Sequence, residues 1–168
     1  MTTNDLSPLL ADPRLTTVGL LLETNAGLRA AFAPPLDRHG LTHSAFEVLV
    51  RLARSPGTRL RMTELADQAT LSNSGLTRVI DRMLQGGLVE RVRDDQDKRV
   101  FYAALTPLGL DRALSALPSH LAVIDEAITE VRDHEELAAL ERALRKIRAV
   151  VKPEADPDRA SQEQSVSA

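Results

Sequence analysis

Hydrogen-bonding and cationic side chains are concentrated in one short stretch of this 168-residue chain. Hydroxyl, amide and guanidinium groups occur there at Ser72, Asn73, Ser74, Thr77, Arg78 and Arg82. Groups of these types donate to phosphate oxygens and exchange hydrogen bonds with base edges. A second polar group, Asp97, Lys98 and Arg99, follows after an apolar run. The residue types therefore predict contact with double-stranded DNA, with Arg99 suited to the narrow, electronegative minor groove.

A helix over residues 72–84 would position the first group. Ser72 is placed to cap its N-terminus, and Gly86-Gly87 is expected to end it. Residues 62–69 predict a shorter preceding helix, with Thr63 as its expected cap, so that the pair forms a helix-turn-helix. An ordinary solvated helix face is the alternative explanation of the polar side. The apolar side has the spacing of an amphipathic helix at Leu76, Val79, Ile80, Met83 and Leu84.

Two extended runs, residues 88–92 and 100–105, predict a β-hairpin that forms a wing. The polar residues 94–99 lie between them. We expect Asp97 to keep the shape of this loop by accepting hydrogen bonds from loop amides or from a nearby guanidinium. The candidate guanidinium groups are those of Arg91, Arg93 and Arg99. A solvated turn with incidental charges is the alternative.

Apolar stripes flank this region. Two of them have steps of four and three residues, at Leu110, Leu114, Leu117, Leu121, Ile124, Ile128 and Val131, then at Leu137, Leu140, Leu144, Ile147 and Val151. A helix over about residues 13–33 adds another apolar face. A single protomer cannot cover all of these apolar stripes, so we expect them to be buried against a second copy in a helical bundle. The alternative is that the stripes pack against one another within one chain.

Several residues should interrupt these long helices. Pro34-Pro35 is expected to end or bend the first one, and Pro118 to kink the one that starts after Thr106-Pro107. His134-Glu135-Glu136 is expected to form or cap the turn before the last helix.

The central elements occur in an order that resembles a known family, the multiple-antibiotic-resistance regulator (MarR) family of winged-helix transcription factors. The matching residues are Glu64-Leu65-Ala66, the helix from Ser72 to Leu84, Gly87-Leu88-Val89, Asp97-Lys98-Arg99, Leu105-Thr106 and Gly109. The resemblance implies a homodimeric regulator, most often a repressor, that binds pseudo-palindromic DNA. It also implies release by a small aromatic or lipophilic effector.

The resemblance further implies where that effector would lie, between the reading lobe and the dimer helices. The residues expected to wall this crevice are Phe32, Leu36, His43, Phe46 and Val50. A mostly apolar pocket with a few polar groups suits a small aromatic acid. Ordinary core packing explains the same residues equally well.

The predicted fold class is mainly α with a small β-hairpin wing, that is, a winged helix-turn-helix plus a helical dimerisation region. Residues 13–40 form the N-terminal helix that contributes to dimerisation, residues 41–105 the DNA-binding domain, and residues 106–151 the C-terminal dimerisation helices. Residues 1–12 and 152–168 are expected to be disordered tails. The C-terminal tail is polar, contains two prolines and has no apolar period.

Charge and composition agree with a DNA-binding lobe on an acidic body. Residues 51–101 contain ten Lys or Arg and seven Asp or Glu, a net charge of +3, although the whole chain carries −3 and the remainder therefore −6. The chain has no cysteine, which excludes disulfides and thiol redox sensing. Without an apolar span of about 20 residues or a signal sequence, we expect a cytoplasmic protein with no membrane partner.

Other functional classes have weaker support. The sequence lacks a Gly-rich phosphate loop, a nucleophile elbow and a metal-binding His-Glu motif, so we expect no enzyme and no cofactor. A triad of Ser72, His43 and an aspartate is less economical than a capping role for Ser72. His39, His43, His120 and His134 include no pair with ligand spacing, so no metal site is expected. A winged helix that binds another protein is the more serious alternative.

Overall fold

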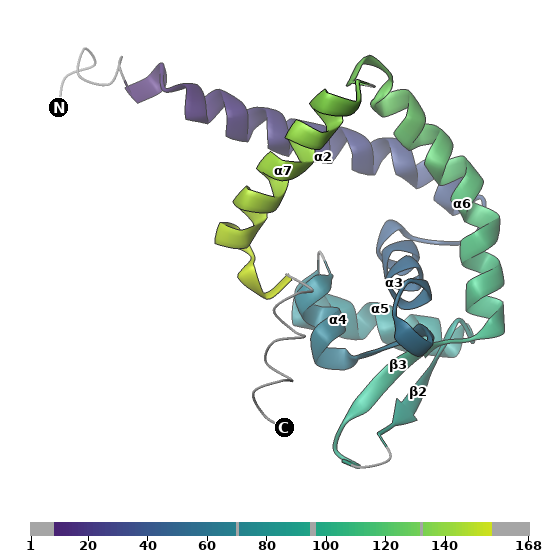
Figure 1. The fold of residues 1–168 in the computed structure, drawn as a ribbon. Coiled ribbons are helices and arrows are strands. Elements are labelled where there is room, and N and C mark those ends of the chain that lie inside the picture. Colours follow the sequence, from purple (N-terminus) through teal and green to yellow (C-terminus); the bar gives the residue numbers. More distant parts are fainter. Residues whose placement is uncertain (1–8, 70, 95–96, 132, 156–168) are drawn as a thin grey trace.

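The computed structural model has long helices arranged around a small winged unit (Figure 1). It describes residues 9–69, 71–94, 97–131 and 133–155. The helices are α2 (Pro13–Asp37), α3 (His43–Ala53), α4 (Met62–Gln68), α5 (Asn73–Gln85), α6 (Pro107–Ala127) and α7 (His134–Val151). The strands are β1 (Arg59–Arg61), β2 (Val89–Arg93) and β3 (Phe101–Leu105), and the 3-10 turns are η1 (Pro56–Thr58), η2 (Thr129–Val131) and η3 (Pro153–Ala155). The predicted fold class is confirmed.

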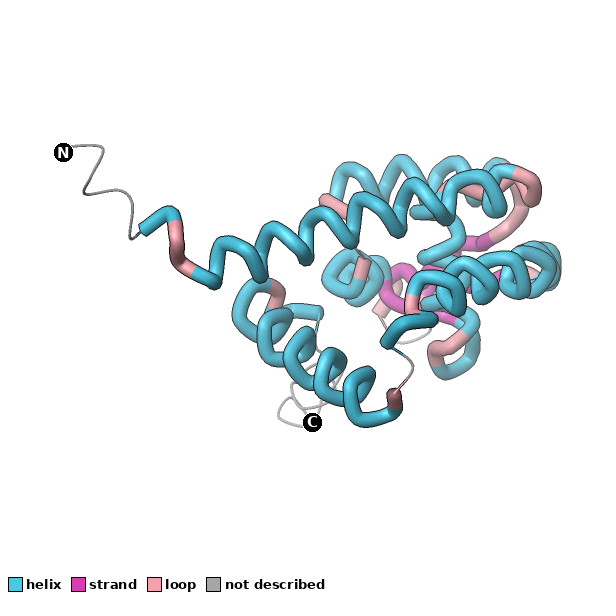
Figure 2. The backbone as a smooth tube through the Cα atoms, turned by 90° about the horizontal axis from the view of Figure 1, so that it is seen from above, coloured by secondary structure: helices cyan, strands magenta, loops and turns pink. Residues whose placement is uncertain are grey.

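The strands form one antiparallel sheet in the order β1-β3-β2. Tyr102 of the central strand lies opposite Arg61 of β1 and opposite Val92 of β2. The β2–β3 hairpin extends away from the helices, while α4 and α5 lie at its base (Figure 1). Figure 2 shows the same molecule from above, with the strands close to the short helices and far from the start of α2. This is the geometry of a winged helix-turn-helix.

The apolar face of α5 forms part of the core. Leu76, Ile80 and Met83 are all at most 2% exposed, and they belong to the same buried cluster as Leu49 and Leu52 of α3. Each fully buried side chain of this kind contributes about 1.5–3 kcal/mol relative to an exposed one. The predicted amphipathic pattern is confirmed, and the polar side of α5 is left facing outward.

Helix ends follow the sequence at most positions. The Ser72 Oγ accepts a hydrogen bond from the Gly75 amide at 3.2 Å, as an N-cap should. Gly87 adopts a left-handed conformation with φ 67° after the end of α5, which glycine tolerates at no steric cost. The expected cap at Thr63 is wrong: α4 begins one residue before it, and the Glu64 carboxylate accepts from the Arg61 amide at 3.1 Å.

Proline does not end the long helices. α2 continues through Pro34 and Pro35 to Asp37, and α6 continues beyond Pro118 to Ala127. Of the end or bend expected at Pro34-Pro35, the end is therefore wrong. Pro35 and Leu36 are buried, so packing offsets the lost backbone hydrogen bonds near the helix terminus. The turn expected at residues 134–136 is also misplaced, because these residues form the first turn of α7 behind the Asp133 cap.

No helix within the described ranges is long and apolar enough to cross a membrane.

Candidate nucleic-acid interface

The outward side of α5 carries most of the predicted reading residues. Ser74, Thr77, Arg78 and Arg82 are exposed, and Ser72 caps the helix beside them. Asn73 is the first residue of α5, and its side chain lies outside what the structure describes. The N-terminus of α5 presents backbone N–H groups and the positive end of the helix dipole, both of which favour a phosphate.

The wing presents Arg99 to solvent. Its side chain is 91% exposed and forms an ion pair with Asp97, with Arg99 Nε 3.2 Å from Asp97 Oδ1. The same carboxylate accepts the Arg99 amide at 3.0 Å. These hydrogen bonds from Arg99 hold the pKa of Asp97 below its usual value. The expected loop-shaping contact of Asp97 is confirmed, and Arg99 is the guanidinium that makes it.

Other wing residues have different contacts. Lys98 is exposed near the tip, while residues 95–96 lie outside the described part of the chain. Arg93 places its guanidinium 5.2 Å from the centre of the Phe101 ring, a cation–π distance. Sequence reasoning did not single out Tyr102 of β3, whose hydroxyl bonds Arg61 at the end of β1 and Asp94 just after β2. No local signal marks it, because Arg61 lies 41 residues away and Asp94 is reached only across the hairpin.

Known proteins share this arrangement. The MarR family profile matches residues 41–101, which span α3 through the start of β3. MhqR, an HTH-type transcriptional regulator of Bacillus subtilis, is 30% identical over 100 residues, which are 60% of this chain and 68% of MhqR. AbsC, a MarR family transcriptional regulator from Streptomyces coelicolor, is 31% identical with a TM-score of 0.77, over 85% of this chain and 97% of AbsC.

This chain belongs to the MarR family. A further MarR family regulator from Streptomyces coelicolor, Sco3205, was solved in complex with DNA. It is 29% identical to this chain with a TM-score of 0.75, over 83% of this chain and 88% of Sco3205. The MarR fold thus extends through the long helices as well as the winged unit.

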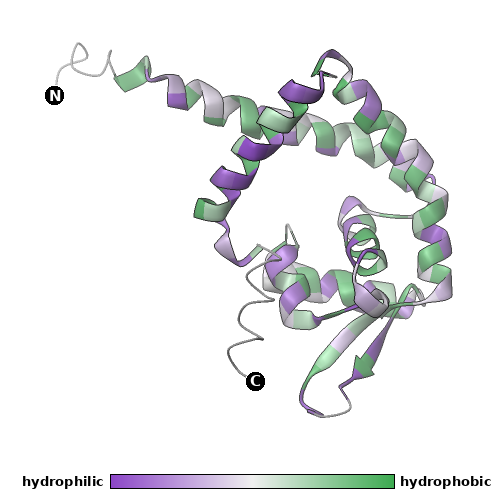
Figure 3. Ribbon diagram, in the orientation of Figure 1, coloured by the Kyte–Doolittle hydropathy of each residue, from purple (hydrophilic) through white to green (hydrophobic). Residues whose placement is uncertain are grey.

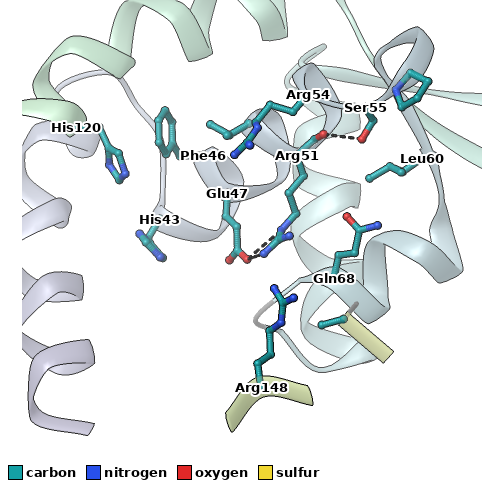
Figure 4. Close-up of a pocket in the computed structure, with 13 residues that line it drawn as sticks. His43, Phe46, Glu47, Arg51, Arg54, Ser55, Leu60, Gln68, His120 and Arg148 are labelled. Carbon is teal, nitrogen blue, oxygen red and sulfur yellow. Dashed lines mark hydrogen bonds and ion pairs between the residues drawn. The ribbon is translucent and has the colours of Figure 1, made fainter. Parts of the chain in front are cut away.

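A second candidate site in this MarR protein is a cavity of about 680 Å³ beside α3 (Figure 4). His43, Phe46 and Val50, three of the five residues expected to wall the effector crevice, line this cavity. Of the other two predicted residues, Phe32 stacks on His43, with ring centres 5.8 Å apart, and Leu36 is fully buried in the core. The cavity also has charged walls that the sequence did not indicate: Glu47, Arg51, Arg54 and Arg148.

His120 of α6 is the main aromatic addition to this site. Its ring lies 4.1 Å from that of Phe32 and 4.5 Å from that of Phe46, measured between ring centres. Among the described residues, His120 Nδ1 and His43 Nδ1 are the buried side-chain polar atoms without a hydrogen-bond partner. Burial lowers the pKa of both imidazoles; Arg29 lowers the pKa of His43 further, and His43 lowers that of His120.

We predict that acid destabilises the protein through these two histidines. Because their folded pKa values are lowered, the unfolded chain binds more protons than the folded one as the pH falls through the usual histidine pKa of about 6.5. The free energy of unfolding should therefore decrease from about pH 7.5 to about pH 5.5 in urea titrations. His120→Phe keeps the ring stack and cannot titrate, so it should lose less stability over this interval. Equal losses in the two proteins would contradict the assignment.

Proposed function

We propose that this MarR protein is a homodimeric transcriptional repressor that binds a pseudo-palindromic operator and is released by a small aromatic or lipophilic ligand. One observation carries the DNA-binding part: the polar face of α5 and the Arg99 wing are both exposed on one winged helix-turn-helix unit. In such a unit the helix enters the major groove and the wing arginine the minor groove. The complex of Sco3205 with DNA supports the same use of this fold.

Exposed apolar side chains on the long helices support the proposed homodimer. The described chain leaves apolar side chains of α2 exposed, such as Leu22 at 65%, and the same holds for Leu114 of α6 and Leu144 of α7, at 57% and 41%. Figure 3 shows hydrophobic residues along the full length of α2 and α6, including the part of α2 that projects from the body. Apolar faces this long are normally covered by a partner, and a second copy would also supply the second reading unit for a two-fold operator.

The cavity beside α3 supports the proposal that a small effector binds this protein. It contacts α3 and β1 of the winged unit as well as α6 and α7 of the flanking helices, through Phe46, Leu60, His120 and Arg148. A ligand held there would therefore touch both parts of the protomer. The arginines suit an anionic group, and an adjoining apolar cavity of about 360 Å³ between α3 and α6 suits a hydrophobic body.

A salt titration of duplex binding tests the DNA-binding proposal. We expect the logarithm of the association constant to fall linearly with the logarithm of the salt concentration, with a slope of about −0.9 for each phosphate contact. A duplex selected by the protein from a random-sequence pool serves as ligand, and a scrambled duplex as control. A winged helix that binds only proteins would retain neither duplex at low salt.

Sedimentation and thermal unfolding test the remaining parts. A homodimer should sediment with about twice the 18.3 kDa mass of one chain, and Leu144→Glu should produce the single-chain mass, because it places a charge on the exposed apolar face of α7. Hydroxybenzoates should raise the melting temperature and lower duplex affinity. Absence of both effects for a broad panel of aromatic acids would remove the effector from the proposal.

A further inference from the structure

Tyr102 joins three segments that are separate in the sequence. Its hydroxyl accepts a hydrogen bond from Arg61 Nε at 3.2 Å and donates one to Asp94 Oδ2 at 3.0 Å. Arg61 lies at the junction of β1 and α4, and Asp94 follows the last residue of β2. One phenol therefore connects the first helix of the helix-turn-helix to the point where the wing loop begins.

Further hydrogen bonds extend this connection beyond Arg61 and beyond Asp94. On the helix side, the Arg61 amide donates to Glu64 of α4 at 3.1 Å. On the wing side, Asp94 Oδ1 accepts the Asp97 amide at 2.9 Å, and Asp97 Oδ1 accepts the Arg99 amide at 3.0 Å. An unbroken series of hydrogen bonds thus runs from the start of α4 to the backbone of Arg99.

The wing loop lies beyond the paired part of the hairpin. Strand pairing of the hairpin ends at Arg93 and Phe101, and Arg99 is almost fully exposed beyond that point. Two backbone hydrogen bonds lie within the loop: the Asp94 amide donates to the Val100 carbonyl at 3.1 Å, and the Val100 amide donates to the Asp97 carbonyl at 2.9 Å. These contacts shape the loop, whereas the Tyr102 bridge fixes it relative to α4.

We propose that Tyr102, acting with Arg61 and Asp94, is a positioning residue that sets the wing arginine relative to α4 of the helix-turn-helix. The inference rests on the proposed function, since it assigns a role in DNA binding to a residue outside the reading face. A contact in a DNA groove requires the guanidinium to lie within about 0.5 Å of its productive position. Holding the wing before binding also reduces the entropy that must be lost on the duplex.

A double-mutant cycle with Arg99→Ala tests the proposal. Tyr102→Phe removes only the hydroxyl and keeps the ring beneath Arg59, whose guanidinium lies 4.8 Å from the ring centre. We expect Tyr102→Phe to weaken binding of the selected duplex by about three- to tenfold in the unsubstituted protein. In the Arg99→Ala background it should change affinity by less than about twofold, because no wing guanidinium is left to position.

Asp94→Ala provides a second variant with an opposing electrostatic effect. It deletes a negative charge close to a polyanion, which by itself strengthens DNA binding. The bridge predicts the reverse, a weaker complex, together with faster amide exchange at Asp97 and Arg99 while the α3 amides keep their exchange rates. A general loss of stability would speed exchange throughout the molecule.

The outcomes separate this inference from the proposed function. If the unsubstituted protein binds no duplex, both fail. If it binds and Tyr102→Phe has no effect, or the same effect with and without Arg99, the positioning role is overturned and DNA binding stands. Non-additive losses combined with weaker binding by Asp94→Ala support the role.

Discussion

Replacing Gly109 by alanine should lower the free energy of unfolding by about 3 kcal/mol or more. Gly109 lies in the first turn of α6, where its amide donates to the Thr106 Oγ1 cap at 3.0 Å. A Cβ at this position would lie 2.0 Å from the Leu88 carbonyl oxygen and 2.9 Å from Leu105 Cδ1. The nearest atom belongs to the backbone, so the clash cannot be relieved by rotating a side chain.

The strain would also reach the wing. The Leu88 carbonyl accepts the Thr106 amide at 3.2 Å and the Thr106 hydroxyl at 3.0 Å, and β2 begins at the next residue. Moving this carbonyl would break the junction that holds α6 against the hairpin. We therefore expect a loss of DNA affinity beyond what the population of unfolded chain explains.

Gly27→Ala is the matched control, because Gly27 lies inside α2 and a Cβ there would meet nothing within 4 Å. The substitution should stabilise the protein by up to about 1 kcal/mol, since alanine favours helix. Urea unfolding followed by far-ultraviolet circular dichroism, at one protein concentration, measures both changes. If Gly109→Ala unfolds at the same urea concentration as Gly27→Ala, the close packing of α6 on Leu88 is refuted.

Features determined by local sequence were predictable. The period of the apolar residues located α5, and the caps at Ser72 and Thr106 located helix starts because each hydroxyl bonds an amide three residues ahead. The wing strands followed from two apolar runs around a polar loop. In each case the residues that decide the structure are neighbours in the chain.

Features determined by tertiary contacts were not predictable. Nothing in the sequence pairs His120 with Phe32 and Phe46, since α6 meets α2 and α3 only in the folded chain. Burial of Pro35 and Leu36 keeps α2 helical where proline alone suggests an end. The N-terminus of α4 was misplaced because Arg61 has no typical capping side chain, and Glu64 supplies the hydrogen bond instead.

Arg99→Ala should weaken binding to a selected duplex by roughly 1–3 kcal/mol, the range typical of a groove contact. Breaking the ion pair between Arg99 and Asp97 costs little free energy, because this pair is exposed to solvent. A guanidinium placed in the minor groove gains hydrogen bonds and a strongly negative potential. Fluorescence anisotropy at two salt concentrations gives both the affinity and the salt slope.

Two further variants identify the origin of this loss. Arg99→Lys keeps the charge and removes the planar fork, so a loss nearly as large as that of Arg99→Ala indicates groove recognition, whereas restored binding indicates a phosphate contact. Arg145→Ala deletes an exposed cation of α7 that pairs with Glu141, and it controls for the general effect of removing one positive charge. If Arg99→Ala matches Arg145→Ala at both salt concentrations, the wing makes no specific contact, and the reading helix alone must account for recognition.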